Sequence, residues 1–504
     1  MNPTSVLVIG AGVGGIAAAA RLAQHGLHVT VLEKNARPGG RCDRVSRGGH
    51  HFDTGPTLFI MPHVYEAEFA ALGTPLPELV DLQRVDPTYC LVFDDGSQLA
   101  LTSDLRSMQD QLEAIEPDSF QGFLRYMGEG HRYYQQAMQH LVNHDFRTAG
   151  EFFNLRNLPL LFTLRPFSRH YHHMAAYFNE PRLKFAFTFQ DVYMGLSPFE
   201  APATFSMMPY TELAHGVWYP RGGMYRVVEA LMEIARRAGV TFAFNTAVKQ
   251  IKLNDTRVKG VVLEDGQRLE ADAVLANADL PYVYQDLLPW DQQTEQLARK
   301  RYSCSVISFF WGVNREYKAL GPHTLFLADD YRSNFEQIGH GLTVPTNASL
   351  YIHAPARLDP GMAPAGEDTL IAVVPVGHMN EQGDYAWKVL IAEARQVVLR
   401  RLALLGISDV ERHIKFEMCF TPLSWHQRYN LVRGATHGLC HNAMQLGYFR
   451  PANRHPRYHN LYFVGASTHP GTGMPTALIS ARLTARRMLD DFGASARVNT
   501  SGHQ

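Results

Sequence analysis

Three glycines near the start of the chain, followed by an acidic residue, have the spacing of a site for a nucleotide diphosphate. Gly10, Gly12 and Gly15 fit the pattern G-x-G-x-x-G, and Glu33 follows them. In such a site the first glycine permits a tight turn, the second lets the backbone approach a pyrophosphate, and the third lets a helix pack close to a sheet. Glu33 can accept hydrogen bonds from both ribose hydroxyls, and its charge repels a 2′-phosphate. We therefore expect a bound dinucleotide, with Gly14 among its contacts.

The elements around these glycines would hold them in position. Residues 6–9 form a short apolar run, which predicts a buried strand, and the Ala-rich residues 16–24 predict a helix. Residues 28–32 predict a second strand that ends at Glu33. This order favours a Rossmann-like α/β domain with the helix N-terminus facing the phosphates. The alternative is an ordinary βαβ unit with a chance glycine turn.

A second group of glycines and arginines favours FAD over a nicotinamide dinucleotide. Residues 37–41 (RPGGR) place paired glycines between cations, which suits a diphosphate. Residues 52–57 (FDTGPT) supply another tight turn with exposed N–H groups. A solvated loop is the alternative for the arginines. The residues expected to bind the cofactor here are Lys34, Gly39, Gly40, Arg41, Gly55, Pro56 and Thr57.

The far end of the chain carries another strand, glycine turn and helix. Residues 460–465 predict a buried strand, residues 468–473 a Gly/Pro turn, and residues 474–489 a helix. No strand and acid follow, so this is not a second dinucleotide site. A helix N-terminus here would stabilise negative charge on a reduced flavin by up to about 2 kcal/mol. We expect Gly465, Thr468, Gly473 and Met474 to contact the cofactor, together with Val248 from mid-chain.

Nearly the whole chain resembles the bacterial and fungal phytoene desaturases, which are carotenoid desaturases within the flavin amine oxidase-like superfamily. The N-terminal fingerprint serves many flavoproteins, whereas the Thr-His-Pro-Gly core of residues 464–473 is much more specific to this group. The other motifs that carry the resemblance are residues 37–41, 52–57, 194–199 (MGLSPF), 216–223 (GVWYPRGG), 276–279 (ANAD) and 448–451 (YFRP).

The resemblance implies FAD-dependent desaturation of a long acyclic polyene such as phytoene. An allylic hydrogen leaves as hydride to the flavin, and the neighbouring carbon loses a proton. A hydrocarbon offers nothing to hydrogen-bond, so an apolar tunnel must provide specificity. Residues 185–189 and 308–311 are candidate tunnel walls, although core packing is the favoured reading of both. No second nucleotide fingerprint appears, which leaves oxygen or a membrane quinone as the expected electron acceptor.

Three residues are candidates for the proton and charge chemistry. His469 lies in the turn expected beside the flavin and is the first candidate for proton handling. Arg41 can stabilise the flavin or its anion. Asp191 can act as an acid or base in the substrate cavity, although a structural role such as helix capping is the favoured alternative.

The order of the segments predicts a discontinuous arrangement. The FAD-binding domain comprises residues 1–85, 213–285 and 441–492, and the substrate domain comprises 86–212 and 286–440. The strands expected at 240–244, 248–253, 258–263 and 272–276 suit a small β-meander attached to the main sheet. Strands at 305–313, 349–353 and 369–374 predict a mixed sheet for the substrate domain. Residues 493–504 are expected to be a polar tail.

Residues 152–179 suggest a membrane surface. This stretch has no Asp or Glu, and it interleaves arginines and histidines with aromatic residues and leucines. Two prolines predict short helices rather than one long helix. The alternative is a helical cap packed on the substrate domain. Because no run approaches the about 18 apolar residues of a spanning helix, and because the chain begins directly in a strand, we expect a cytoplasmic, peripherally membrane-associated protein.

Composition limits the other partners. The net charge is −1, with 47 basic and 48 acidic residues, so no overall field attracts nucleic acid. Five scattered cysteines form no C-x-x-C pair, which is typical of a reducing compartment. The histidine pairs 437/441 and 455/459 lie among glycines and prolines that interrupt a helix, so we expect no metal site.

Two alternatives to the desaturase stay open. The first is a related enzyme that isomerises a polyene or oxidises a later carotenoid, a diapocarotenoid or an amine. The second, from another class, is a prenyl or lipid escort protein that shares the fold but lacks flavin. The intact phosphate-binding pattern argues against the escort protein.

Overall fold

The apolar run at the start of the chain becomes the central strand of a five-stranded parallel sheet. The computed structural model describes residues 4–155, 157–288, 291–380 and 383–501. The strand order is β19-β13-β1-β2-β9, and each pair of neighbours is parallel. The five strands are β19 (Leu461–Phe463), β13 (Ala273–Ala276), β1 (Ser5–Ile9), β2 (His28–Leu32) and β9 (Thr241–Ala243). The chain crosses from β1 to β2 on one side and reaches β13 on the other, so the carboxyl end of β1 is a topological switch point, where open α/β sheets bind ligands.

Both faces of this sheet are covered, which explains the almost continuously apolar strands. Val6 and Val8 pack on helices α1 (Val13–Gln24), α10 (Tyr225–Arg237) and α17 (Met474–Ser501). Leu7 and Ile9 face the other side. There they meet the antiparallel meander β10 (Val248–Asn254), β11 (Arg257–Leu263) and β12 (Arg268–Glu270), together with α11 (Leu280–Tyr282) and α12 (Gln293–Ala298).

The expected meander is therefore partly wrong. The strands expected at 240–244 and 272–276 are β9 and β13, which belong to the parallel sheet, and the third meander strand is β12. The apolar run of β13 is buried on both faces, which suits a central strand, whereas β10 and β11 contain both exposed and buried positions.

A second, seven-stranded sheet has the order β18-β14-β17-β16-β15-β6-β7. Its β15–β6 pair is parallel and its other pairs are antiparallel, so the sheet is mixed, as expected. The strands expected at 305–313, 349–353 and 369–374 are confirmed as β14, β16 and β17. The strands are β18 (Ile414–Phe420), β14 (Ser305–Val313), β17 (Asp368–Val376), β16 (Leu350–His353), β15 (His323–Leu327), β6 (Tyr89–Phe93) and β7 (Gln98–Leu101). The other helices around this half of the molecule are α13 (Tyr331–His340), α14 (Trp387–Ala403), α15 (Val410–His413) and α16 (Pro422–Tyr429).

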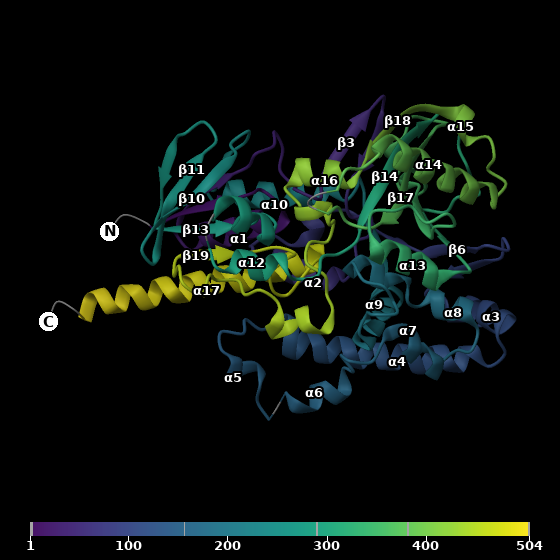
Figure 1. The fold of residues 1–504 in the computed structure, drawn as a ribbon, viewed down its shortest axis with the longest axis horizontal. Helices are drawn as coiled ribbons and strands as arrows, with labels where there is room; N and C mark the ends of the chain where they lie inside the picture. Colours follow the sequence, from purple (N-terminus) through teal and green to yellow (C-terminus); the bar gives the residue numbers. More distant parts are fainter. Residues whose placement is uncertain (1–3, 156, 289–290, 381–382, 502–504) are drawn as a thin grey trace.

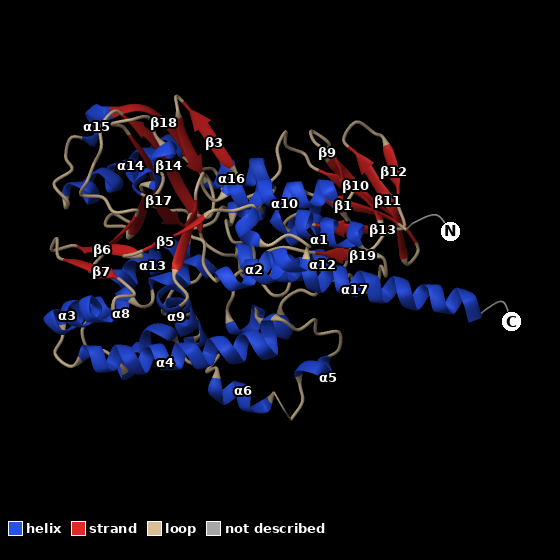
Figure 2. Ribbon diagram, turned by 180° about the vertical axis from the view of Figure 1, so that it is seen from behind, coloured by secondary structure: helices blue, strands red, loops and turns tan. Residues whose placement is uncertain are grey.

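The helices between residues 105 and 214 form a separate layer below both sheets (Figure 1). It consists of α3 (Leu105–Ile115), α4 (Ser119–Ala137), α5 (Ala149–Phe152), α6 (Leu158–Thr163), α7 (His170–His173), α8 (Pro181–Ala186) and α9 (Met207–Ala214). Figure 2 shows the same arrangement from behind, with α5 and α6 at the outer edge. Residues 152–179 therefore contain short helices, as their prolines predict.

Smaller elements join these layers. The pairs β3 (Arg44–Arg47) with β4 (His50–Asp53) and β5 (Leu82–Val85) with β8 (Val217–Pro220) are antiparallel, and α2 (Pro62–Ala71) packs beside α17. Helix α17 continues to Ser501, into the segment expected to be a polar tail. Within the described ranges, no helix is both long enough and apolar enough to cross a bilayer.

A buried ion pair at the start of β17 makes a first testable prediction. Asp368 is fully buried, and Arg357 donates to its two oxygens at 2.8 and 2.6 Å. Because Arg357→Met leaves the carboxylate buried without its cation, we expect the free energy of unfolding to fall by about 2–3 kcal/mol. A urea titration measures this loss. The control is Arg106→Met, because Arg106 is 88% exposed and contacts only an i,i+4 aspartate at 3.8 Å; an equal effect of both changes would contradict the prediction.

Candidate functional site

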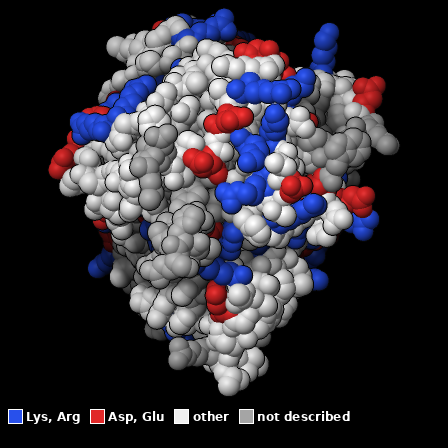
Figure 3. All heavy atoms as spheres, turned by 90° about the vertical axis from the view of Figure 1, so that its left-hand side faces the viewer, with Lys and Arg blue, Asp and Glu red and all other residues white. Residues whose placement is uncertain are grey.

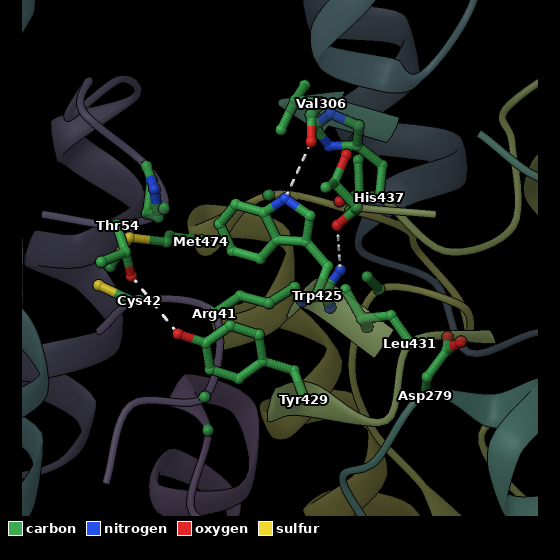
Figure 4. Close-up of a pocket in the computed structure, with 18 of the residues that line it drawn as sticks. Arg41, Cys42, Thr54, Asp279, Val306, Trp425, Tyr429, Leu431, His437 and Met474 are labelled. Carbon is green, nitrogen blue, oxygen red and sulfur yellow. Dashed lines mark hydrogen bonds between the residues drawn. The ribbon is translucent and has the colours of Figure 1, made fainter. Parts of the chain in front are cut away.

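A cavity of about 500 Å³ opens at the carboxyl end of the parallel sheet and continues under the mixed sheet. Its wall includes the loop after β1, the end of β2, the loop after β13 and the start of α17. Figure 4 shows side chains from residues 41–54, from the loop after β13, from α16 and from the start of α17 converging on one space. Residues from the beginning, middle and end of the chain therefore form one site.

The glycine loop is built as its spacing predicts. Gly10, Gly12 and Gly14 line the cavity, and α1 begins directly after Gly12. Gly15 faces the sheet instead, and a Cβ there would lie only 2.3 Å from the carbonyl oxygen of Gly10. Gly15 therefore permits close packing of helix on strand, and the first three glycines leave backbone free to meet a ligand.

Glu33 is held at the cavity wall by main-chain amides. One carboxylate oxygen accepts a hydrogen bond from Ala11 N at 2.8 Å, and the other accepts one from Asn35 N at 2.9 Å. The side chain is 5% exposed and lines the cavity. Its charge is thus fixed beside the glycine loop, where a ribose diol would meet it.

The second glycine group lies against the first. Gly39 N donates to Ala11 O at 2.8 Å, and Gly12 pairs with Gly39 in a short parallel bridge. A Cβ at Gly55 would meet the carbonyl oxygen of Arg41 at 1.9 Å, so only glycine fits this crossing. The predicted residues of this group that line the cavity are Lys34, Gly39, Gly40, Arg41, Gly55, Pro56 and Thr57.

The predicted C-terminal turn reaches the cavity only in part. Gly465, Gly473 and Met474 line it, as does Val248 from the start of β10. Thr468 does not; its hydroxyl donates to Gly465 O at 3.0 Å and so supports the turn from behind. The N-termini of α1 and α17 both reach the cavity wall, which favours an anionic ligand.

Three ionisable side chains, those of Arg41, Asp279 and His437, line the same cavity near one another (Figure 4). Arg41 donates to Thr436 O at 2.9 Å. Burial lowers the pKa of Arg41, while the Asp279 carboxylate opposes that shift. Asp279 accepts hydrogen bonds from Ser467 at 2.6 Å and from Val432 N at 3.2 Å, and burial raises its pKa. Burial lowers the pKa of His437 to about 4, and Arg41 adds to that shift, so His437 is neutral near pH 7.

The part of the cavity under the mixed sheet is mainly apolar, although Ser308, Asn334 and Ser349 also line it. Among the described residues that line the cavity, Glu33, Lys34, Arg41 and Asp279 carry the formal charges, and all lie on the nucleotide side. On the other side Tyr193 and Tyr351 supply phenol groups. Trp425 and Tyr429, both on α16, stack with their ring centroids 5.7 Å apart. The indole of Trp425 donates to Val306 O at 3.1 Å. The apolar wall includes Phe189, Leu325, Phe326, Leu327, Phe335, Ile338, Leu350 and Val373.

The structure does not bring two of the three catalytic candidates to the cavity. His469 is 5% exposed, packs edge-to-face on Phe146 at 5.7 Å, and burial lowers its pKa to about 4. Asp191 is fully buried and contacts His170 at 2.9 Å. Neither lines the cavity, so the geometry favours structural roles for both, and only Arg41 has direct access to a ligand there.

Of the residues predicted to form tunnel walls, some line the cavity and others do not. Phe189 and Ser308 line the cavity, whereas Phe185, Phe187 and Trp311 belong to hydrophobic cores. Several lining residues have no role predicted from the sequence, among them Asn277, Asp279, Trp425, Tyr429 and His437. Asn277 and Asp279 lie in the ANAD motif directly after β13, and that position at a strand end was the available signal.

The histidine pairs have other partners. His441 accepts from Thr472 N at 3.0 Å, and His455 contacts Asp291 at 3.1 Å. In the described part of the chain, no three His, Cys, Asp or Glu side chains gather as metal ligands. All five cysteines are unpaired thiols, each within the described ranges.

Comparison with known proteins decides the family. The family of flavin containing amine oxidoreductases matches residues 13–489. The phytoene desaturase of Phycomyces blakesleeanus is 41% identical over 512 aligned residues, covering 98% of this chain and 87% of the relative. The chain belongs to the flavin-containing amine oxidoreductase family.

Other relatives of this flavin oxidoreductase agree. The zeta-carotene-forming phytoene desaturase of Myxococcus xanthus is 41% identical and covers 96% of this chain and 93% of its own length. The 4,4′-diapophytoene desaturase of Staphylococcus haemolyticus is 34% identical, with coverages of 97% and 99%. A solved putrescine oxidase has a TM-score of 0.65 at 15% identity, with coverages of 97% and 99%, and shows the shared fold.

FAD is the cofactor of this enzyme, and the residues present fit it. Two adjoining glycine loops, a fixed carboxylate and two helix N-termini line one continuous cavity. Glu33 would hold the ribose, the loops at Gly12 and Gly40 would hold the diphosphate, and Arg41 would lie near the reactive half of the cofactor.

Proposed function

We propose that this FAD-dependent oxidoreductase desaturates a long acyclic carotenoid precursor of the phytoene type. The observation that carries the proposal is the change of character along one cavity, from charged nucleotide-binding loops to a wall of aliphatic and aromatic side chains. Such a wall can hold a hydrocarbon by shape, because the hydrocarbon has no polar group to be recognised. The names of the relatives at about 40% identity support the same substrate class.

The residues of the chain then have distinct tasks. Bound FAD supplies a hydride acceptor. The apolar wall positions the allylic carbon and excludes water, which favours hydride transfer over side reactions. Arg41, with its charge balanced by Asp279, would offer a guanidinium to stabilise negative charge on the reduced cofactor. Neutral His437 adds a polar group without a second positive charge.

Anaerobic incubation of the holoenzyme with phytoene in liposomes tests this function. We expect the oxidised flavin absorbance to bleach while longer-wavelength polyene bands appear. A polyene isomerase would shift the bands without net bleaching, and an amine oxidase would bleach with a diamine and not with phytoene. Either result would refute the proposal. Readmission of oxygen, or of a quinone under anaerobic conditions, identifies which of these two proposed acceptors restores the absorbance.

We also propose that residues 152–179 dock the enzyme on the membrane that holds its substrate. Phe153, Leu155 and Leu158 are more than half exposed, and so are Phe162 and Phe167. Helices α5 and α6, which include or adjoin these residues, lie at the lower edge in Figures 1 and 2, away from both sheets. Exposed Arg165 and Arg169 can meet lipid headgroups. The face in Figure 3 mixes acidic and basic side chains over its middle and carries mostly uncharged atoms at its lower end.

A matched pair of double variants tests the docking. We expect Phe162→Ser/Phe167→Ser to reduce binding to anionic liposomes at least tenfold, because each change removes an exposed apolar group from the interface. The control is Val389→Ser/Leu404→Ser, which removes two exposed apolar residues on the opposite side of the molecule. Co-sedimentation measures both, and equal binding by the two double variants would refute the docking site.

A further inference from the structure

A buried carboxyl group lies behind the apolar wall of the cavity. Glu212, on α9, is 1% exposed. Its two hydrogen bonds come from neutral groups: Tyr89 donates to one oxygen at 2.9 Å and Gln190 donates to the other at 3.1 Å. Burial of a carboxylate without a cationic partner costs free energy, so burial at this position favours the protonated form of Glu212.

The carboxyl group is connected to the cavity by two phenols. Tyr193 donates to the Tyr89 hydroxyl at 2.8 Å, and Tyr89 in turn donates to Glu212. Tyr193 lines the cavity, whereas Tyr89 is fully buried. Because the hydrogen of Tyr193 points toward Tyr89, a lone pair of its oxygen is available to a donor in the cavity.

The groups around this chain differ in how readily they hold a proton. Burial raises the pKa of Glu212 to about 7, against the lowering effect of its two hydrogen bonds. Burial also raises the pKa values of Tyr89 and Tyr193 well above the usual range, so both phenols stay protonated. His323, on β15 with its ring 6.1 Å from that of Tyr89, has a pKa far below its usual range because of burial. Glu212 is therefore the member of this cluster that exchanges a proton near neutral pH.

We propose that Tyr193 and Tyr89 carry the proton released in desaturation to Glu212. The proposal rests on the proposed function. The hydride leaves the allylic carbon with its electron pair and is taken by FAD. The C–H bond of the neighbouring carbon then breaks; its electron pair forms the new double bond and its proton goes to the Tyr193 oxygen. Tyr193 passes its own proton to Tyr89, and Tyr89 passes its own to Glu212. The phenols end unchanged and Glu212 becomes neutral.

This route explains how an apolar chamber can accept a proton. A charged base in the chamber would lose its hydration at a large cost in free energy. It would also draw water into a space that must hold a hydrocarbon. A phenol at the wall is compatible with an apolar ligand, and the charge stays behind it at Glu212. Asp191 differs from Glu212 in its partner, because its carboxylate is paired with His170 at 2.9 Å.

The test measures flavin bleaching by phytoene in a single anaerobic turnover, as a function of pH. For the wild-type holoenzyme we expect the rate to rise with pH through an apparent pKa near 7, as Glu212 ionises. Glu212→Gln and Tyr193→Phe should each slow bleaching at least 100-fold with little change in phytoene binding, and Glu212→Gln should lose the pH dependence. Tyr126→Phe is the control, since Tyr126 is another buried tyrosine and bonds to His170 and to Phe187 O.

A second readout does not depend on turnover. Infrared difference spectra of the substrate-free holoenzyme on acidification should show a buried carboxylic acid band that titrates near pH 7 and is absent from Glu212→Gln. If Glu212→Gln does not fold, Tyr193→Phe carries the kinetic test because it removes a single oxygen atom. Unchanged rates in Tyr193→Phe, or no such band in the wild type, would overturn the relay. Wild-type enzyme that forms no polyene would instead overturn the proposed function.

Discussion

Replacement of Glu33 by alanine is expected to yield a folded protein that binds FAD at least 100-fold more weakly. The carboxylate is fixed by Ala11 N at 2.8 Å and Asn35 N at 2.9 Å, so it needs no rearrangement to accept hydrogen bonds from ribose. Hydrogen bonds to a charged group contribute about 1.5–3 kcal/mol each, and a ribose offers two. The expected loss of about 3–5 kcal/mol corresponds to roughly a hundredfold to several thousandfold in the dissociation constant.

Titration of the apoprotein with FAD, followed by flavin fluorescence, measures the change. Glu33→Gln should be intermediate, because it keeps one acceptor oxygen and loses the charge. Asp272→Ala is the matched control: Asp272 accepts from Ser5 N at 2.8 Å at the opposite end of the same parallel sheet, and it does not line the cavity. Normal affinity in Glu33→Ala would show that this carboxylate does not hold the ribose.

The sequence predicted those parts of the fold whose causes are local. The strand before Gly10, the helix after it and the strand that ends at Glu33 are each specified by apolar pattern and glycine spacing within about 30 residues. The strand Ser305–Val313 was predicted in full for the same reason, since a long apolar run buried on both faces has few alternatives.

Pairing between distant segments could not be predicted in this way. The run that became β13 has the composition of either a meander strand or a central strand, and only its neighbours β1 and β19 decide between them. Asp279 acquires its role from Ser467 and from the positive charge of Arg41, which lie far away in the chain. A short stretch of sequence therefore gives no indication of these contacts.

The catalytic candidates show the same limit. His469 and Asp191 are candidates because their residue types suit acid–base chemistry and because they are expected beside the flavin and in the substrate cavity, but access to a ligand depends on how the surrounding helices pack. His469 turns toward Phe146, and Asp191 is occupied by His170. Glu212 was not singled out, because a lone glutamate in a predicted helix gives no sign that it will be buried beside two tyrosines.

The largest structural effect is expected from Arg450, in the YFRP motif. Its guanidinium is 3% exposed and donates only to main-chain carbonyls. It bonds to Thr468 O at 3.0 Å and to Cys440 O and Gln445 O at 3.1 Å, and it also bonds to Leu439 O and Ala466 O. One side chain therefore ties residues 439–445 to residues 466–468, directly before the turn that leads into α17.

We expect Arg450→Met to lower the free energy of unfolding by about 5 kcal/mol or more, because each buried carbonyl left without a donor costs about 1–3 kcal/mol. Cys440 O keeps one hydrogen bond, from Gln445 Nε2 at 3.1 Å, so the loss comes mainly from the other four carbonyls. FAD binding should weaken as well, since Gly465, Gly473 and Met474 line the cavity on the turn that Arg450 supports. Arg450→Lys should recover little of the lost stability, because an ammonium has three donors and cannot reproduce the planar fork of a guanidinium.

Arg454→Met is the control, with a partly exposed ion pair to Asp491 at 3.3 Å and an expected loss of stability below about 1 kcal/mol. Urea unfolding followed by flavin release reports both quantities in one experiment. If Arg450→Met kept wild-type stability, water or neighbouring amides would have to satisfy all of these carbonyls, and the C-terminal turn would not depend on this cation for its shape.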